Sequence, residues 1–173
     1  AEGADRVTSD MMGTLGTIIN SLALASALTK AGVKAKVFSA ITMPSIADSY
    51  TARAAKAALE EGYVVVLGGG IANPFFTTDT AAALRAIELD CDVVLKGTNV
   101  DGVYSEDPKK NPKAQRYDHI SHDEVIARNL KVMDTAAFAL ARDNSLPILV
   151  YALDDKEGLM GVLTGKTRNT RVG

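Results

Sequence analysis

The sequence predicts an α/β protein in which helices cover both faces of a mainly parallel central sheet. Three observations lead to this class. Helical and strand patterns alternate along most of the 173 residues. The run 63–67 is apolar throughout and rich in β-branched residues, as expected for a strand buried on both faces. Two of the expected strands lead directly into glycine-containing turns, the place where open α/β folds bind ligands.

The composition is that of an ordinary globular protein, with 47% hydrophobic residues, 23% charged residues and a net charge of −2. The length and the absence of a linker or repeat predict a single domain over 1–173. Positive charge clusters only at 166–171, which argues against a nucleic-acid partner. The single cysteine, Cys91, excludes an internal disulfide and fits a reducing cytoplasm. No apolar run approaches the ~18 residues of a membrane span, so we expect no membrane partner.

Residues up to 62 predict a helix, a strand and a second helix. Apolar and small residues at spacings of three and four predict the first helix, and these residues are Met12, Leu15, Ile19, Leu22, Ala23, Ser26 and Ala27. Thr8 or Ser9 is the expected N-cap, which places Asp10 in the first turn. A strand over 35–39 and a helix over 50–60 follow.

The stretch 63–88 is the one around which the rest of the chain is organised. It comprises the buried strand, three consecutive glycines, the aromatic loop 73–76 and a helix that begins near Thr77 or Thr78. Glycines and the free amides of a helix start can bind an anion, and Phe75 and Phe76 could pack on a planar base. The alternative is that this stretch binds no ligand and only forms a tight βα turn covered by the two phenylalanines.

The second half continues the alternation of strands and helices. We expect a strand over 92–96 with a turn over 97–104, an exposed loop over 108–117, a helix over 132–143 and a strand over 147–151. Two further features concern short motifs. Ser121 and Glu124 form a capping box, which places His122 at a helix start in solvent. Gly165 and Asn169 could turn a terminal hairpin.

Four stretches resemble the bacterial UMP kinases, a branch of the amino acid kinase superfamily. NPFFTTDTAAALRA, at 73–86, resembles their nucleotide-acceptor motif, and TSDMMGTLGTIIN, at 8–20, resembles the segment whose aspartate binds the UMP ribose. VVLKGTNVDGVYSEDP, at 93–108, resembles their ATP-binding loop. The stretch 131–151 resembles the segment whose aspartate lies by the active centre. This resemblance implies a three-layer α/β/α sandwich.

The resemblance also assigns roles to residues. The implied UMP-binding residues are Asp10, Ile71, Ala72, Asn73, Pro74, Phe75, Phe76, Thr77 and Thr78. The implied ATP-binding residues are Thr98, Asn99, Tyr104 and Asp107, with the Tyr104 ring near adenine. Asp79 and Asp134 are the catalytic candidates, and no protein metal site is expected. For Asp10, Asp79 and Asp134, a carboxylate that only stabilises a helix start is the alternative.

The implied reaction transfers the γ-phosphoryl group of ATP to UMP, giving UDP and ADP in pyrimidine nucleotide biosynthesis, with Mg²⁺ accompanying ATP. The resemblance further implies a cytoplasmic homo-oligomer, typically a hexamer, with GTP and UTP as regulators. Another enzyme of the same fold, such as an acetylglutamate or aspartate kinase, is one alternative. A non-catalytic nucleotide-binding protein is another.

Two phosphate-binding parts of the family pattern do not occur in this sequence. They are a Lys-x-Ser-Gly-Glu segment and a second glycine turn, Gly-Gly-Gly-Asn, followed by an arginine. We therefore expect the chain to lack the N-terminal part of the family pattern. Because phosphoryl transfer depends on positioning and charge neutralisation, we also expect the isolated chain to be inactive.

Overall fold

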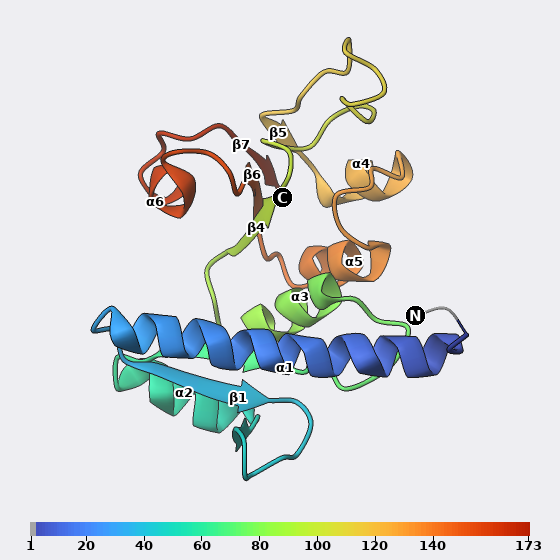
Figure 1. Cartoon of the computed structure of the whole chain (residues 1–173). Helices are drawn as coiled ribbons and strands as arrows, with labels where there is room; N and C mark the ends of the chain where they lie inside the picture. The colour runs from blue at the N-terminus through green and yellow to red at the C-terminus, as the bar shows by residue number, and fades with distance from the viewer. Residues whose placement is uncertain (1–2) are drawn as a thin grey trace. The chain divides into compact units, whose positions relative to one another are not determined.

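The computed structural model describes residues 3–173, which form two compact units, one ending at Ala81 and the other running from Ala82 to Gly173 (Figure 1). Each unit combines helices with a sheet of its own. Every strand pair is parallel except one, so the expected mainly parallel α/β class is confirmed. The strands lie in two sheets of three and four strands within this part of the chain.

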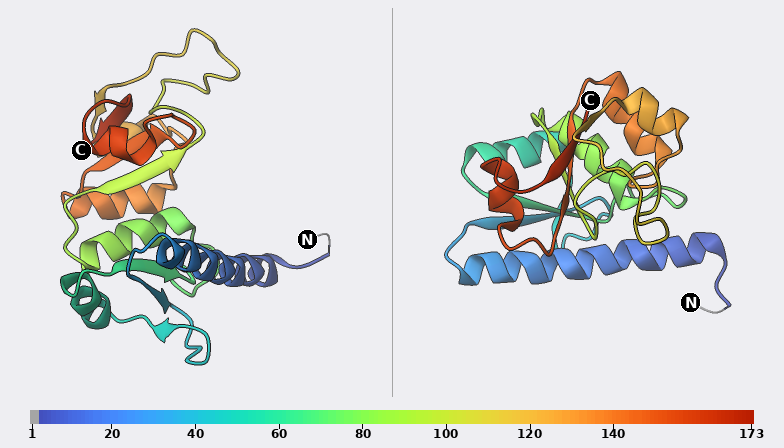
Figure 2. Two further views of the ribbon diagram at one scale, coloured as in Figure 1. Left: turned by 60° about the vertical axis from the view of Figure 1, so that its left-hand side comes forward. Right: turned by 90° about the horizontal axis from the view of Figure 1, so that it is seen from above.

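The first unit is a three-stranded parallel sheet in the order β2-β1-β3. Helices α1 and α2 lie on its two faces (Figure 2). Its elements are α1 (Arg6–Lys30), β1 (Ala35–Ser39), β2 (Asp48–Ser49), α2 (Ala52–Glu60) and β3 (Val64–Gly68). The predicted strand over 35–39 is confirmed without change, and Thr51 caps α2 by accepting a hydrogen bond from the Ala54 amide.

Helix α1 begins earlier than predicted. Asp5 is its N-cap, and this carboxylate accepts a hydrogen bond from the Thr8 amide at 2.9 Å. The same contact holds the pKa of Asp5 below its usual range. Thr8 and Ser9 are therefore helical residues, not caps, and Asp10 lies one turn into the helix. The cap prediction failed because an aspartate three residues upstream competes equally well for this role.

The predicted first helix is confirmed, but the apolar stripe that predicted it does not face the sheet. Ile18 and Ser21 are the buried residues of the helix, while the four stripe residues Met12, Leu15, Ile19 and Leu22 are 38–68% exposed. The sheet approaches α1 very closely at Gly68, where an added Cβ would lie 2.7 Å from Ser21 Oγ. Only small or hydroxyl side chains fit at this contact, so the apolar stripe faces away from the sheet.

By length and composition α1 is apolar enough to cross a membrane, since an 18-residue window has a mean hydropathy of 1.4 and is 11% buried. The expectation that no apolar run approaches the length of a membrane span is therefore wrong. Core helices of soluble proteins and signal sequences meet the same criterion, so the finding is weak evidence. Here α1 packs on β1 and β3.

The second unit is built on a four-stranded sheet in the order β4-β6-β7-β5, in which only β6 and β7 are antiparallel. Helix α3 starts in the first unit and continues into the second. The elements are α3 (Thr78–Glu88), β4 (Val94–Thr98), β5 (His119–Ile120), α4 (His122–Ala127), α5 (Thr135–Asp143), β6 (Ile148–Ala152), α6 (Gly158–Leu163) and β7 (Asn169–Val172). Fully buried side chains form the core of this unit, among them Phe138, Ile148, Val150 and Val172.

Two predictions for this unit are wrong. The tail forms no hairpin of its own, because β7 pairs antiparallel with β6 and Gly165 follows α6 at φ +70°. His122 is buried, not solvent-exposed. The backbone of Gly173 packs against the imidazole, since a Cβ there would lie 2.7 Å from His122 Cε1. The capping box itself is confirmed, because Ser121 Oγ accepts a hydrogen bond from the Glu124 amide.

Candidate functional site

The first unit contains a cavity of about 320 Å³ between α1 and the loop that follows β3. We call it the acceptor cavity. Its walls come from the start of α1 and from the glycine turn, the aromatic loop and the first residues of α3. The lining residues are Arg6, Ser9, Asp10, Gly13, Thr14, Thr17, Gly70, Ile71, Asn73, Phe76, Thr77 and Thr78.

The glycine turn is attached directly to α1. The Gly69 amide donates to Thr17 Oγ1 at 2.9 Å, and Thr17 Oγ1 donates in turn to the Thr14 carbonyl at 2.7 Å. Gly69 has φ +82°, and an added Cβ would lie 3.2 Å from the Ala40 amide nitrogen. Glycine is therefore required at this position both by conformation and by space.

Asp10 joins the two walls of the acceptor cavity. Its carboxylate accepts from the Phe75 amide at 2.8 Å and from Arg6 Nε at 2.8 Å to each oxygen. The Arg6 hydrogen bond and, next, the Phe75 amide hold the pKa of Asp10 below its usual range. Asp10 is half-buried. It fixes the aromatic loop as well as facing the cavity.

The aromatic loop has an unusual backbone. Ala72 and Phe75 have φ of +60° and +71°, a region that side chains other than glycine rarely adopt. Such residues cost about 1–3 kcal/mol each and cluster at binding sites. The loop ends where the Asp79 amide donates to Thr77 Oγ1 at 3.0 Å, so the prediction that a threonine hydroxyl caps α3 is confirmed.

Most of the expected acceptor residues line one cavity. Asp10, Ile71, Asn73, Phe76, Thr77 and Thr78 do so, whereas Ala72, Pro74 and Phe75 lie in the same loop but outside the lining set. On the α1 side of the wall, sequence reasoning identified Asp10 and missed the other lining residues, above all Arg6. The spacing of four residues between Arg6 and Asp10 is a signal for an ion pair on one helix face, and it could have identified this cation.

The second unit contains a cavity of about 570 Å³, which we call the donor cavity. Three of the four expected ATP-binding residues line it, namely Thr98, Tyr104 and Asp107, while Asn99 is exposed and does not. The full lining set is Thr98, Val100, Gly102, Tyr104, Ser105, Glu106, Asp107, Pro108, Lys109, Lys110, Arg128, Asn129, Leu130, Lys131 and Val132.

The opposite wall of the donor cavity was not predicted. It comes from the loop 128–132 between α4 and α5, including Lys131. Together with Lys109, Lys110 and Arg128, this residue makes the cavity rich in cations. Arg128 is already paired with Glu124 at 2.9 Å and donates to the Tyr117 hydroxyl at 2.8 Å.

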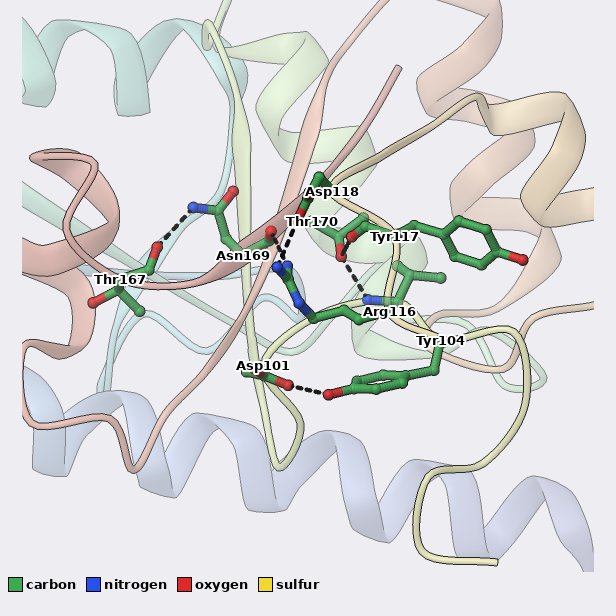
Figure 3. A network of polar contacts seen from close by, with 9 residues as sticks. Asp101, Tyr104, Arg116, Tyr117, Asp118, Thr167, Asn169 and Thr170 are labelled. Atoms are coloured by element: carbon green, nitrogen blue, oxygen red, sulfur yellow. Dashed lines mark hydrogen bonds and ion pairs between the residues drawn. The ribbon is translucent and has the colours of Figure 1, made fainter. Parts of the chain in front are cut away.

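Tyr104 presents its ring to the donor cavity, because its hydroxyl is engaged elsewhere. The hydroxyl donates to Asp101 Oδ1 at 2.6 Å (Figure 3). This hydrogen bond is the main reason why the pKa of Tyr104 lies above its usual value. The aromatic face is therefore the part of Tyr104 that is available to a ligand.

The two catalytic candidates line neither cavity. Asp79 lies in the first turn of α3, next to the cavity residue Thr78. Asp134 is the N-cap of α5 and accepts from the Ala137 amide at 2.7 Å. Over residues 3–173, no group of three or more His, Cys, Asp or Glu side chains could hold a metal ion.

Comparison with known proteins identifies the family. Residues 1–152 match the amino acid kinase family. The uridylate kinases of Brucella anthropi and Mesorhizobium japonicum are each 56% identical to this chain over 172 residues, which cover 99% of the chain and 72% of either relative.

Solved structures agree with these sequence relatives. A UMP kinase from Ureaplasma parvum is 42% identical with a TM-score of 0.93, covering 98% of this chain and 72% of its own. A UMP kinase from Bacillus anthracis is 40% identical with a TM-score of 0.93, covering 99% of this chain and 71% of its own. The chain therefore belongs to the amino acid kinase family and, within it, to the uridylate kinases.

Proposed function

We propose that the chain carries the acceptor and donor cavities of a UMP kinase, which transfers the γ-phosphoryl group of ATP to UMP in pyrimidine nucleotide biosynthesis. The observation that carries the proposal is the acceptor cavity. It brings Asp10 of α1 together with the loop over 71–78, although these segments are separated by about 60 residues in the sequence. These are the two segments that resemble the UMP-binding parts of the family.

In this proposal UMP occupies the acceptor cavity. Asp10 faces the ribose, while the glycine turn and the start of α3 offer backbone amides and threonine hydroxyls to the phosphate. The exposed ring of Phe76 is the candidate partner of the uracil base. The cavity is already shaped before UMP binds, because Thr17 and Asp10 hold the glycine turn and the aromatic loop against α1.

ATP occupies the donor cavity. Its adenine packs on the face of Tyr104, and Thr98 and Asp107 contact the nucleotide. Asn99 remains a proposed contact from the same loop, although it does not line the cavity. The four cationic side chains along this cavity provide positive charge close to a ligand that carries several negative charges.

The reaction is a displacement at phosphorus. A phosphate oxygen of UMP forms a bond to the γ-phosphorus of ATP as the bond from that phosphorus to the β–γ bridging oxygen breaks, and ADP leaves. The acceptor is already ionised, so no strong general base is needed, and catalysis depends on positioning and on charge stabilisation. Mg²⁺ supplies positive charge at the phosphates when it is bound with ATP. Asp79 and Asp134 are the proposed residues for orienting groups around the transferring phosphate.

One observation bears on the alternative that the acceptor is an amino acid. Such an acceptor would need a cation to meet its carboxylate, and Arg6 does line the acceptor cavity. However, both Asp10 oxygens accept from Arg6 Nε, so the pair carries no net charge. The sequence relatives and solved structures named above are also uridylate and UMP kinases. We therefore infer a nucleotide acceptor.

We infer that the protein is cytoplasmic and assembles as a homo-oligomer, with a hexamer implied by the family resemblance. The exposed stripe of α1, defined above by Met12, Leu15, Ile19 and Leu22, supports assembly, because exposed apolar patches often mark contact surfaces. GTP and UTP are the proposed regulators. Light scattering coupled to size-exclusion chromatography tests the assembly.

The experiment that tests the function is a phosphoryl-transfer assay on the full-length enzyme with ATP and Mg²⁺. UMP, acetylglutamate and aspartate are offered separately, and ADP release is measured. Of the three acceptors, we expect only UMP to give ADP release. Turnover with an amino acid instead would refute the proposal, and nucleotide binding without any turnover would indicate a non-catalytic role.

A further inference from the structure

The segment 98–117, which we call the donor loop, is joined to β7 by several contacts, and one of them is a fully buried hydroxyl. Thr170 is 0% exposed, and its Oγ1 accepts a hydrogen bond from the Val103 amide at 2.8 Å. The same hydroxyl donates to the Tyr117 carbonyl (Figure 3). One side chain therefore satisfies two backbone groups that belong to different strands of the donor loop.

Those two strands form a small hairpin. The Tyr117 amide donates to the Val103 carbonyl at 2.9 Å, and the Ser105 amide donates to the Gln115 carbonyl at 2.9 Å. Tyr104 and Arg116 pair between them in antiparallel fashion. Since Thr170 bonds to Val103 and Tyr117, it lies at the base of the hairpin that carries Tyr104.

The backbone before Tyr104 lies against this hydroxyl. A Cβ added to Gly102 would lie 2.4 Å from Thr170 Oγ1 and 3.1 Å from Arg116 Cδ. The loop can follow this path only because residue 102 has no side chain. The position of Thr170 therefore determines where the chain passes immediately before the ring of Tyr104.

Arg116 reinforces the attachment. Its Nη1 donates to the Asn169 carbonyl at 2.6 Å, and its Nη2 pairs with Asp118 at 2.6 Å (Figure 3). The guanidinium therefore joins the hairpin to the residue before Thr170. Thr170 remains the central element, because it is the fully buried one and no water can replace its two hydrogen bonds.

We propose that Thr170 is a positioning residue for the phosphoryl donor: through Val103 and Gly102 it fixes the ring of Tyr104 in the donor cavity. This inference rests on the proposed function, since it takes ATP to be the ligand of that cavity. Thr170 does not line the cavity itself. Its effect on the nucleotide is transmitted by the loop.

The test compares Thr170→Val with Thr170→Ser in the full-length enzyme. Valine keeps the shape of the side chain but leaves the Val103 amide and the Tyr117 carbonyl without partners, whereas serine keeps the hydroxyl. We expect Thr170→Val to raise the KM for ATP about tenfold, the order of the cost of unpaired buried groups. The KM for UMP should stay within about twofold, and Thr170→Ser should stay close to the wild type. The control is the same change at an exposed threonine, Thr164→Val.

Hydrogen exchange separates positioning from general destabilisation. In Thr170→Val we expect faster exchange of the backbone amides over 101–106, with unchanged protection of β6. The positioning role would be overturned if exchange accelerated equally in both segments. It would also be overturned if Thr170→Ser raised the KM for ATP as much as Thr170→Val does. An unchanged KM for ATP in Thr170→Val would overturn it as well.

A second variant keeps the test decisive if Thr170→Val fails to fold. Arg116 is only half-buried, and Arg116→Lys removes its paired contacts while keeping the charge. We expect this variant to raise the KM for ATP about threefold, with the KM for UMP unchanged, whereas an unchanged KM for ATP would contradict the inference. If the wild-type enzyme shows no UMP-dependent turnover, the proposed function itself is refuted. If the wild-type enzyme is active and the variants have the same KM for ATP, only the positioning role is refuted.

Discussion

The acceptor and donor cavities are held in shape by different means. The acceptor cavity depends on two contacts to α1, the exposed one between Asp10 and the Phe75 amide and the part-buried one between Thr17 and the Gly69 amide. The donor cavity is bordered by a hairpin whose base is attached to the fully buried Thr170. Buried hydrogen bonds contribute more to stability than exposed ones, because a lost partner cannot be replaced by water.

The difference predicts two kinds of variant. A change at Asp10 should alter binding or turnover with little change in stability, since its contact with the Phe75 amide is exposed to solvent. A change at Thr170 should alter ATP binding and loosen the donor loop, because the hydrogen bonds of this residue are buried. The two cavities also differ in charge, because the one cation of the acceptor cavity is paired with Asp10 while the donor cavity is lined by three lysines and an arginine.

The largest effect is expected for the 173-residue chain assayed alone. It contains neither the Lys-x-Ser-Gly-Glu segment nor the second glycine turn that hold the phosphates in the family. Losing one preorganised donor costs about 2.7–4 kcal/mol, or roughly 100- to 1,000-fold in rate, so losing both should abolish detectable turnover. ADP release with ATP, Mg²⁺ and UMP is the measurement. Robust UMP-dependent release would show instead that Lys109, Lys110 and Lys131 supply the missing cations.

The next largest effect is expected for Asp79→Asn in the full-length enzyme. If Asp79 acts on the transferring phosphate, kcat should fall about 100-fold while UMP affinity changes less than about threefold. Asp123→Asn, a change in the first turn of α4, is the matched control. Equal losses in kcat and UMP affinity would reassign Asp79 to the helix start alone.

Asp10→Asn should weaken UMP binding about tenfold, as expected for the loss of one charged hydrogen bond. Arg6→Gln is the comparison, because it removes the ion pair but keeps the carboxylate. Calorimetry measures the UMP affinity of both variants. If Asp10 contacts the ribose directly, Asp10→Asn should lose much more UMP affinity than Arg6→Gln. Equal losses of affinity would mean that the Arg6–Asp10 ion pair only holds the aromatic loop.

The pH dependence of Asp10 follows from its lowered pKa. The contribution of its carboxylate to stability is present above the unfolded pKa, near 3.9, and is lost as the pH falls through the lower folded pKa. UMP affinity should therefore show no Asp10-dependent change between pH 5 and pH 8. If the UMP affinity of the wild type changed between pH 5 and pH 8 and that of Asp10→Asn did not, a lowered pKa of Asp10 would be contradicted.

The two possible roles of Asp134, helix cap and catalytic charge, can be separated by substitution. Asn caps a helix about as well as Asp, so Asp134→Asn should keep the stability, whereas Asp134→Ala should cost about 0.5–2 kcal/mol. Urea unfolding measures this difference. A fall in turnover of Asp134→Asn, at unchanged stability, would support the catalytic role, and full activity of this variant would reject it.

The smallest effect concerns the pH dependence of stability in the second unit. Burial is the main reason why the pKa of His122 lies below its usual value. The unfolded chain therefore takes up the proton first, so stability is fully present above the unfolded pKa, near 6.5, and is lost as the pH falls toward the folded pKa. The urea midpoint should fall from pH 7.5 to pH 5.5 and should fall less in His122→Gln. The exposed His119→Gln is the control, and equal slopes in all three proteins would contradict this account.

The sequence by itself determined the features that depend on neighbouring residues. The α/β class, the strand over 35–39, the capping box at Ser121 and the threonine start of α3 were all predicted from local patterns. These follow from backbone conformation and from hydrogen bonds between residues a few positions apart, which one stretch of sequence specifies.

Only the tertiary structure decided which surfaces are buried and which segments face one another. The stripe of α1 has the period of a buried face, but the close approach of Gly68 to Ser21 turns another face toward the sheet. His122 is buried because Gly173, about 50 residues away, packs against it. The loop 128–132 similarly completes the donor cavity from a distant part of the chain. Burial depends on contacts between such distant segments, and periodicity shows only that a helix has an apolar side, not what covers it.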